Sequence, residues 1–265
     1  MTDPRTPGGR APFDEVAESY HRFRPRPPEV LVSLLTSYAR CASPPRVVDL
    51  GCGTGLSTRM WAESAREVTG IDPSEGMLAE ARRRAGAPNV RYLCADAAAT
   101  GLDAGSADVV VAVQSFHWMH PARTLAEIGR ILRPGGVFAA VDTRFPPAID
   151  AELDAAFERF LFRAQERIGD GDRTPRWNKE GHLQRMVDSG VFRHVREAQL
   201  HAVGRGGADD LVGFAWSAVD GPRLRALGAR DEDLELDVLR DAARRVLGAR
   251  EVDWIFGYRA RLAVK

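Results

Sequence analysis

The stretch that decides the fold is VVDLGCGTGL, residues 47–56, in which three glycines within five residues follow an apolar run. Such a loop lets a ligand approach the backbone closely. A Walker A loop requires GxxxxGK[ST], and no lysine follows Gly55, so the pattern argues against nucleoside triphosphate hydrolysis. A dinucleotide fingerprint requires GxGxxG, whereas Gly51, Gly53 and Gly55 are spaced GxGxG. Asp49 would repel a pyrophosphate and suits a cationic head group, or an amino group held through water.

Outward from this loop, short apolar runs alternate with helical patterns through the first half of the chain. Helices are expected at 56–65, 74–85 and 121–132, with Pro121 at a first helical position and Ser74 as a cap. Strands are expected at 47–50, 67–71, 89–95, 107–113 and 136–142. Repeated βα units of this length predict an α/β fold with helices on both faces of the sheet.

The second half changes character. Helical patterns cover 148–168, 182–189, 211–219 and 231–247, and strand-like alternation covers 192–200 and 254–264. We expect the two late strands to form an antiparallel edge pair and the helices between them to form a lid. The predicted organisation is an N-terminal tail with cap helices at 1–45, then one domain at 46–265 with lid insertions at about 145–190 and 205–248.

The overall composition limits the classes of partner. The 37 basic residues balance 37 acidic ones, so no global field favours nucleic acid or membrane. Three cysteines without CxxC spacing indicate neither a disulfide framework nor a metal site. The first ten residues lack a signal-peptide core, and no apolar run approaches a membrane span. The sequence therefore predicts a soluble, cytoplasmic protein.

Two further carboxylates follow predicted strands. Asp72 ends the second strand, where an acid can accept hydrogen bonds from ribose hydroxyls, and Asp96 follows the third, where it could accept from an adenine amine. Each also has a structural interpretation as a helix cap. Because parallel strands end at one edge, Asp49, Asp72 and Asp96 should line the ligand-binding rim of the sheet.

The motifs VVDLGCGTG, GIDPSEGML, CADAAA, ADVVVAVQSFHW and EIGRILRPGG, between residues 46 and 142, resemble class I S-adenosylmethionine-dependent methyltransferases. The resemblance is to the small-molecule branch often labelled type 11, which includes trans-aconitate and ubiquinone-pathway enzymes. FDEVAESYHRFRP and GYRARLAVK resemble its cap helix and final strand. The resemblance implies a Rossmann-like, seven-stranded, mostly parallel sheet with an antiparallel edge strand and a helical cap.

Carried over by motif, the resemblance implies S-adenosylmethionine as cofactor and a set of residues around it. Asp49 and the three glycines of the loop would surround the methionine part, and Asp72 would hold the ribose. Asp96 and Ala97 would read the adenine edge. Met77 would pack near the adenine, with a core position as its other interpretation, and Gln114 and Ser115 would lie beside the sulfonium.

The acceptor side is expected around the segment that follows the fourth strand. His117 has the titration range of a general base, and a structural imidazole is its alternative. Trp118 and Phe116 could wall an apolar acceptor or contact the sulfonium through cation–π interaction. His120 occupies a helix cap position, with a role in substrate binding or none. Further substrate or lid candidates are Tyr20, Arg24, Arg144, Trp177 and Trp216.

No [DNS]PP[YF] box follows the fourth strand, as it usually does in enzymes that methylate amide or adenine amino groups. The sequence therefore predicts methyl transfer to the oxygen, nitrogen or carbon of a small, partly hydrophobic molecule such as a secondary metabolite. Three alternatives remain: intramolecular alkylation or cyclisation with the same cofactor, a non-catalytic protein that binds it, and a nicotinamide oxidoreductase. The oligomeric state is left open.

Overall fold

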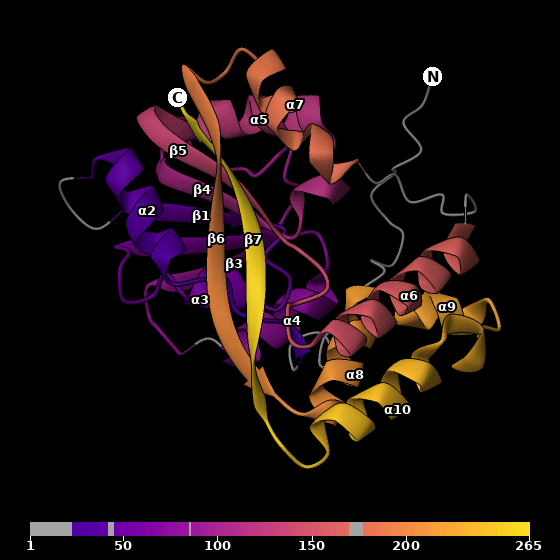
Figure 1. Ribbon diagram of the computed structural model, residues 1–265. Coiled ribbons are helices and arrows are strands. Elements are labelled where there is room, and N and C mark those ends of the chain that lie inside the picture. The colour runs from indigo at the N-terminus through magenta and orange to yellow at the C-terminus, as the bar shows by residue number, and fades with distance from the viewer. Residues whose placement is uncertain (1–22, 42–44, 85, 170–176) are drawn as a thin grey trace.

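The computed structural model describes residues 23–41, 45–84, 86–169 and 177–265, and it shows a seven-stranded sheet (Figure 1). The strand order is β3-β2-β1-β4-β5-β7-β6. The bounds are β1 (Arg46–Leu50), β2 (Glu67–Asp72), β3 (Val90–Cys94), β4 (Ala107–Val113), β5 (Leu132–Thr143), β6 (His194–Gly206) and β7 (Val252–Val264). The first five strands pair in parallel, and β7 is antiparallel to both β5 and β6. The predicted α/β, Rossmann-like fold class is confirmed, with the antiparallel strand one position in from the edge strand β6.

Helices cover both faces of this sheet because alternate residues of the inner strands point in opposite directions. On one face Val47 packs in a core with Leu31 and Leu35 of α2 (Val30–Ala39). On the other face Val48 packs in a core with Leu125 of α5 (Pro121–Ile131). The remaining helices of these layers are α3 (Leu56–Arg59), α4 (Glu75–Arg84) and α7 (His182–Asp188).

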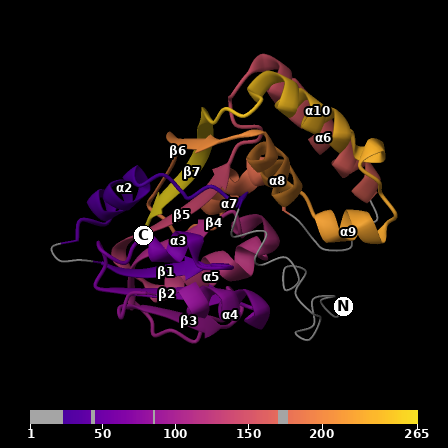
Figure 2. The same ribbon diagram turned by 90° about the horizontal axis from the view of Figure 1, so that it is seen from below.

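Four helices gather in a separate group beyond one end of the β6–β7 pair (Figures 1 and 2). They are α6 (Ala151–Ile168), α8 (Ala208–Ala218), α9 (Gly221–Ala226) and α10 (Leu236–Leu247), with the 3-10 turn η4 (Glu232–Leu234) between the last two. Their shared core is aromatic: Phe214 of α8 contacts Phe157 of α6 and Trp254 of β7. We call this group the helical layer.

The helical layer arises from both predicted insertions, but not from all of the first. Helix α7 falls inside the predicted range 145–190, yet it packs against the sheet, where Met186 is fully buried in the core shared with α5. A separate lid is therefore proposed only for α6 and for the segment from α8 to α10. No helix among the described residues is long and apolar enough to cross a membrane.

Some elements differ in extent from the sequence-based expectation. The helix expected at 56–65 ends at Arg59, and the Asn89 side chain donates to the carbonyls of Ala62 and Ala65, which stabilises the turn that follows. Helix α9 was not expected; Asp220 caps it by accepting from the Arg223 backbone. Strand β6 runs to Gly206 because it pairs with β7 along its whole length.

Tyr92 of β3 packs against two glycines, Gly70 of β2 and Gly55 of the glycine loop. Its ring lies so close to β2 that a Cβ on Gly70 would approach its Cδ1 to 2.7 Å. Its hydroxyl lies beside Gly55, where an added Cβ would approach it to 2.3 Å. The side chain is 8% exposed, so it has little room to move. Tyr92 therefore places the glycine loop against β2.

We predict that Gly70→Ala lowers the free energy of unfolding by about 1–3 kcal/mol, because the new methyl overpacks the Tyr92 ring. The matched control is Gly86→Ala, since a Cβ on Gly86 meets nothing within 4 Å and neither glycine has a positive φ. Urea denaturation measures both variants. Equal stability of the two variants would show that Tyr92 does not constrain β2.

Candidate functional site

The glycine loop turns sharply after β1. Gly51, Gly53 and Gly55 have φ of +65°, +54° and +76°, a region that residues with a Cβ rarely adopt. The backbone N–H groups of Gly51 and Cys52 both donate to the carbonyl of Ile71, which ties the loop to the end of β2. A Cβ on Gly53 would meet nothing within 4 Å, so this part of the loop faces open space.

Asp72 joins the loop to helix α4. Its Oδ2 accepts from the Gly53 backbone N–H at 2.9 Å, and its Oδ1 accepts from the Ser74 N–H at 2.9 Å. Ser74 Oγ accepts in turn from the Met77 backbone N–H, as a cap should. The side chain of Met77 is buried. Ser74 is therefore the cap of α4, and Asp72, whose alternative interpretation was that cap, instead forms the turn before the helix and positions the loop.

Asp49 points into the protein from β1. Its Oδ2 accepts from Ser57 Oγ at 2.6 Å and from Thr58 Oγ1 at 2.7 Å, at the start of α3. Its Oδ1 is buried and has no hydrogen-bond partner among the described residues. Burial raises the pKa of this carboxyl to about 6, against the lowering effect of the two hydroxyl donors. The orphaned oxygen is suited to a donor that comes from outside the chain.

Asp96 and Ala97 extend the rim beyond β3, which pairs with β2 up to Asp72 and Cys94. Asp96 is exposed, and its Oδ1 accepts from the Ala98 N–H at 2.7 Å within a tight turn. The Ala97 side chain is 9% exposed. Asp96 thus stabilises a tight turn; no helix directly follows it in the described chain, so its alternative interpretation as a helix cap does not apply.

Gln114 and Ser115 follow β4 on the other side of the loop. Gln114 has φ +54°, a strained value for a residue with a side chain, and its N–H donates to Val141 of β5. Ser115 Oγ donates to the Leu50 carbonyl at 2.7 Å, and an added Cβ on Gly51 would approach Ser115 Cβ to 2.5 Å. Ser115 therefore lies directly against the glycine loop, and Gln114 is held beside it by β5.

The aromatic residues after Ser115 occupy different environments. Phe116 is 2% exposed and packs against Phe138 and His182, so it belongs to the sheet core and not to the wall of an acceptor site. His117 and Trp118 are half-buried, with ring centroids 5.2 Å apart. All three form the short 3-10 helix η1 (Phe116–Trp118).

Trp177 covers η1 from the segment that follows α6. Its backbone N–H donates to the His117 carbonyl at 2.8 Å, and its ring contacts His120 edge-on at 5.5 Å. The Arg185 guanidinium lies 5.5 Å from the centre of the same ring. His120 precedes α5 without making a side-chain cap, so its imidazole is available for this contact.

The other lid candidates contact the helical layer or lie at the surface. Arg24 donates to the Ser217 carbonyl of α8 and lies over the Phe145 ring, while Arg144 is exposed. The ring of Trp216 lies 4.6 Å from the guanidinium carbon of Arg225 and takes part in packing within the helical layer, away from η1. Tyr20 lies outside the described residues.

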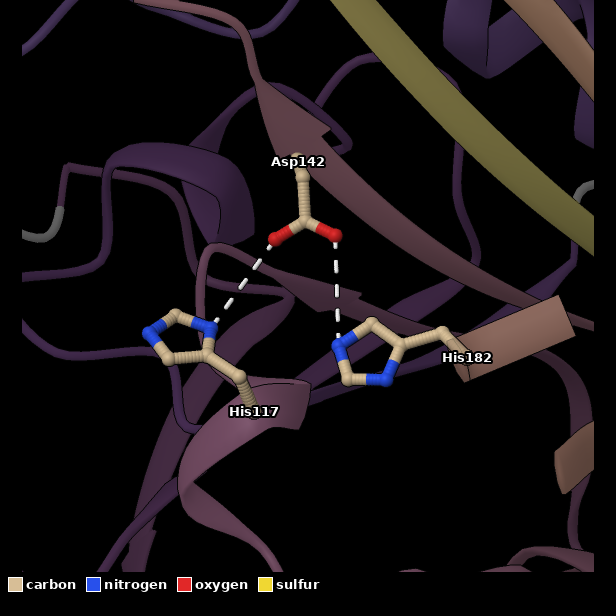
Figure 3. A group of neighbouring side chains, drawn as sticks. All are labelled: His117, Asp142 and His182. Atoms are coloured by element: carbon tan, nitrogen blue, oxygen red, sulfur yellow. Dashed lines mark ion pairs between the residues drawn. The ribbon is translucent and has the colours of Figure 1, made fainter. Parts of the chain in front are cut away.

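A buried polar cluster centred on Asp142 lies behind His117 (Figure 3). His117 Nδ1 lies 3.9 Å from Asp142 Oδ1, and His182 Nε2 lies 4.0 Å from Asp142 Oδ2. Lys179 Nζ lies 3.2 Å from Oδ1, and Arg261 Nη1 donates to Oδ2. Lys179 also donates to Gln114 Oε1 at 2.8 Å, which connects the cluster to the rim of the sheet.

Sequence reasoning missed most of this cluster. Asp142 ends an apolar strand as Asp72 does, which was an available signal, and Lys179 is one of two lysines in the chain. His182 and Arg261 carried no local signal, because Arg261 reaches Asp142 only through the pairing of β7 with β5.

The protonation of His182 follows from its neighbours. Arg185 Nη1 lies 3.1 Å from His182 Nδ1, and arginine can only donate, so Nδ1 accepts and the proton of the neutral ring lies on Nε2. Burial lowers the pKa of His182 to about 4, which keeps the ring neutral. A protonated Nε2 is no metal ligand, and two cations already share Asp142. The cluster is thus better suited to hydrogen bonding than to holding a metal ion.

The comparisons with known proteins match this geometry. Residues 48–140 match the family model described as a methyltransferase domain. These residues form a class I, S-adenosylmethionine-dependent methyltransferase domain. Over 125 residues the chain is 40% identical to an uncharacterized methyltransferase of Mycobacterium bovis, covering 47% of this chain and 49% of the relative. The match thus spans about half the length of that relative.

Two other similarities bear on the methyltransferase domain and its fold. Over 101 residues the chain is 43% identical to trans-aconitate 2-methyltransferase of Methylobacterium nodulans, covering 37% of this chain and 38% of that enzyme. A solved structure from Anaeromyxobacter dehalogenans, described as a candidate type II methyltransferase, has a TM-score of 0.67 at 29% identity. The similarity covers 91% of this chain and 97% of the chain in that structure, so it also includes the regions outside the matched domain.

The residues of the methyltransferase domain fit S-adenosylmethionine. A Cβ on Gly53 would meet open space, and Asp49, two residues before the loop begins, has a buried oxygen without a hydrogen-bond partner among the described residues. Asp72 and Asp96 lie at the ends of adjacent strands, on the side where a ribose and an adenine would extend. Met77, buried at the start of α4, would provide apolar contact. These assignments are proposals drawn from placement and burial.

We predict that Asp72→Ala weakens binding of S-adenosylhomocysteine roughly 10- to 100-fold, because the carboxylate would accept hydrogen bonds from the ribose hydroxyls. Titration calorimetry measures the affinity. Ser74→Ala is the matched control, since it removes the cap of α4 and leaves the Asp72 carboxylate. Unchanged affinity in Asp72→Ala, or equal losses in both variants, would contradict the ribose assignment.

We predict a pH dependence of stability that originates at Asp49. The pKa of the carboxyl is raised by folding from 3.8 to about 6, so between these values the folded state keeps a proton that the unfolded state has lost. The free energy of unfolding relative to Asp49→Asn should therefore fall by as much as about 3 kcal/mol as the pH rises from about 4 to about 6.5. Urea denaturation across this range measures it; a pH-independent difference would contradict the buried ionisation.

Proposed function

We propose that this protein transfers the methyl group of S-adenosylmethionine to a small, partly hydrophobic molecule. The observation that carries the proposal is the arrangement at the end of β4. There Ser115 lies against Gly51 of the glycine loop, and His117 and Trp118 follow within one turn. The cofactor supplies an already activated methyl group, so the chain mainly has to bind, align and desolvate the acceptor.

The proposed acceptor site is bounded by aromatic rings. Trp118 lies beside His117, and Trp177 covers the same segment while its ring contacts His120. Half-buried aromatic rings with polar edges favour a flat or partly apolar molecule over a highly charged polymer. The zero net charge of the chain supports the same preference.

His117 is proposed as the general base for an acceptor that must lose a proton. Its side chain is 12% exposed, so it keeps access from one side while most water is excluded. The relative that methylates trans-aconitate acts on a carboxylate compound, which a base does not have to activate. The aromatic wall and the base together favour a hydroxyl, enol or amine acceptor for this chain.

Methylation assays with a labelled methyl group test the proposed function. The purified chain is incubated with methyl-labelled S-adenosylmethionine and a panel of phenols, enols, amines and carboxylic acids, together with a low-molecular-weight metabolite extract. We expect label in a small organic product. Tight binding of S-adenosylhomocysteine with no label transferred to any acceptor would overturn the proposal and support a non-catalytic binding protein.

We predict that His117→Ala lowers turnover roughly 10²- to 10⁴-fold, the usual contribution of a general base, without a comparable change in affinity for S-adenosylhomocysteine. His194→Ala is the control, because His194 is exposed at the start of β6. Steady-state kinetics with the acceptor found above provides the readout. Full activity of His117→Ala would remove His117 as the base.

A further inference from the structure

We infer that Asp142 is a positioning residue that holds the His117 imidazole with its proton on Nδ1, so that Nε2 is the basic atom offered to the acceptor. This inference rests on the proposed function. The two ring nitrogens of His117 face different ways: Nδ1 points toward Asp142, and Nε2 lies on the far side of the ring (Figure 3). A carboxylate facing one nitrogen favours the tautomer that places the proton there.

The neighbours of Asp142 divide evenly between its two oxygens. Oδ2 is faced by Arg261 Nη1 and by His182 Nε2, whose proton is fixed there by the Arg185 contact to Nδ1. Oδ1 is faced by Lys179 Nζ and by His117 Nδ1. Three donors thus surround the carboxylate, and Nδ1–H of His117 is the fourth.

Cationic groups surround the buried carboxylate of Asp142. Arg261 is fully buried and is itself held by Glu197 Oε2 at 3.2 Å from its Nε and by the Lys179 carbonyl at 3.1 Å from its Nη2. These contacts hold the guanidinium against Asp142. A carboxylate fixed in this way can orient a neighbouring imidazole.

The 3.9 Å between Nδ1 and Oδ1 is longer than a hydrogen bond. Such contacts at catalytic sites are often long before the reactants are bound and shorten in the reactive complex. Lys179 Nζ lies closer to the same oxygen, at 3.2 Å, and burial lowers the pKa of its ammonium group. Because Lys179 competes for Oδ1, it weakens the interaction between Asp142 and His117.

This arrangement identifies the chemical class of the acceptor as one with a removable proton, such as a phenol or an enol. The acceptor's proton moves to His117 Nε2, and the electron pair left on the acceptor forms the bond to the methyl carbon. The pair of the breaking carbon–sulfur bond stays on sulfur, which becomes a neutral thioether. The imidazolium then carries one positive charge, which Asp142 balances at 3.9 Å.

The tautomer of His117 is measured directly by long-range ¹H–¹⁵N correlation spectra of the imidazole groups, in full-length protein with S-adenosylhomocysteine added. His117→Gln assigns the signal among the six histidines. We expect the Nδ1–H form to dominate in the wild type and to lose its dominance in Asp142→Asn. Glu197→Gln is the matched control, because it removes a carboxylate from the same network that does not face His117. A dominant Nε2–H form in the wild type would overturn the inference.

Two variants with opposite expected effects provide a second readout. With the acceptor found by the assays above, Asp142→Asn should move the acidic limb of the kcat/KM profile to lower pH by roughly one pH unit. Lys179→Met should move it to higher pH, because Oδ1 then serves His117 alone. Should Asp142→Asn fail to fold, the Lys179→Met shift remains decisive. Shifts in the same direction, or no shift in Lys179→Met, would contradict the inference.

The two levels of proposal fail separately. If label transfer occurs but the wild-type tautomer is Nε2–H, only the role of Asp142 is wrong. If the tautomer is Nδ1–H and no acceptor in the panel or extract is methylated, the proposed function is wrong, while the positioning of His117 by Asp142 stands.

Discussion

The structure depends on one carboxylate, that of Asp72, which bonds the Gly53 N–H with one oxygen and the Ser74 N–H with the other. It joins the glycine loop, strand β2 and helix α4 at a single point. The Ile71 carbonyl accepts two hydrogen bonds from backbone N–H groups of the same loop, and the Tyr92 hydroxyl packs against Gly55. The ends of β1, β2 and β4 therefore meet in one rigid rim, and residues that are far apart in sequence face a single ligand.

The parts of the site formed by short-range geometry could be predicted from the sequence. The glycine loop, the acids that end β2 and follow β3, and the residues after β4 each lie where a parallel strand ends, so strand assignment alone brings them to one edge. The same reasoning predicted too long a helix for α3. The sequence of residues 60–65 does not indicate that Asn89, far along the chain, stabilises a turn there. Phe116 was assigned to the acceptor wall, but packing with Phe138 and His182 places it in the core.

The cluster behind His117 could not be predicted, for a topological reason. Asp142 and Arg261 are 119 positions apart, and they meet only because β7 enters the sheet antiparallel to β5. Lys179 and His182 arrive from the segment between α6 and β6, after the chain has returned from the helical layer. The pattern along one strand contains no information on which charged residue of a later strand it will meet. The sequence thus predicts the cofactor side of the site better than the proton-transfer side.

The most direct test is a crystal structure of the full chain with S-adenosylhomocysteine. The account predicts that the ribose hydroxyls lie within hydrogen-bond distance of the Asp72 carboxylate, the amino group near Asp49 and the glycine loop, and the thioether sulfur between Gln114 and His117. A ligand bound elsewhere, or bound with the sulfur directed away from η1, would contradict it.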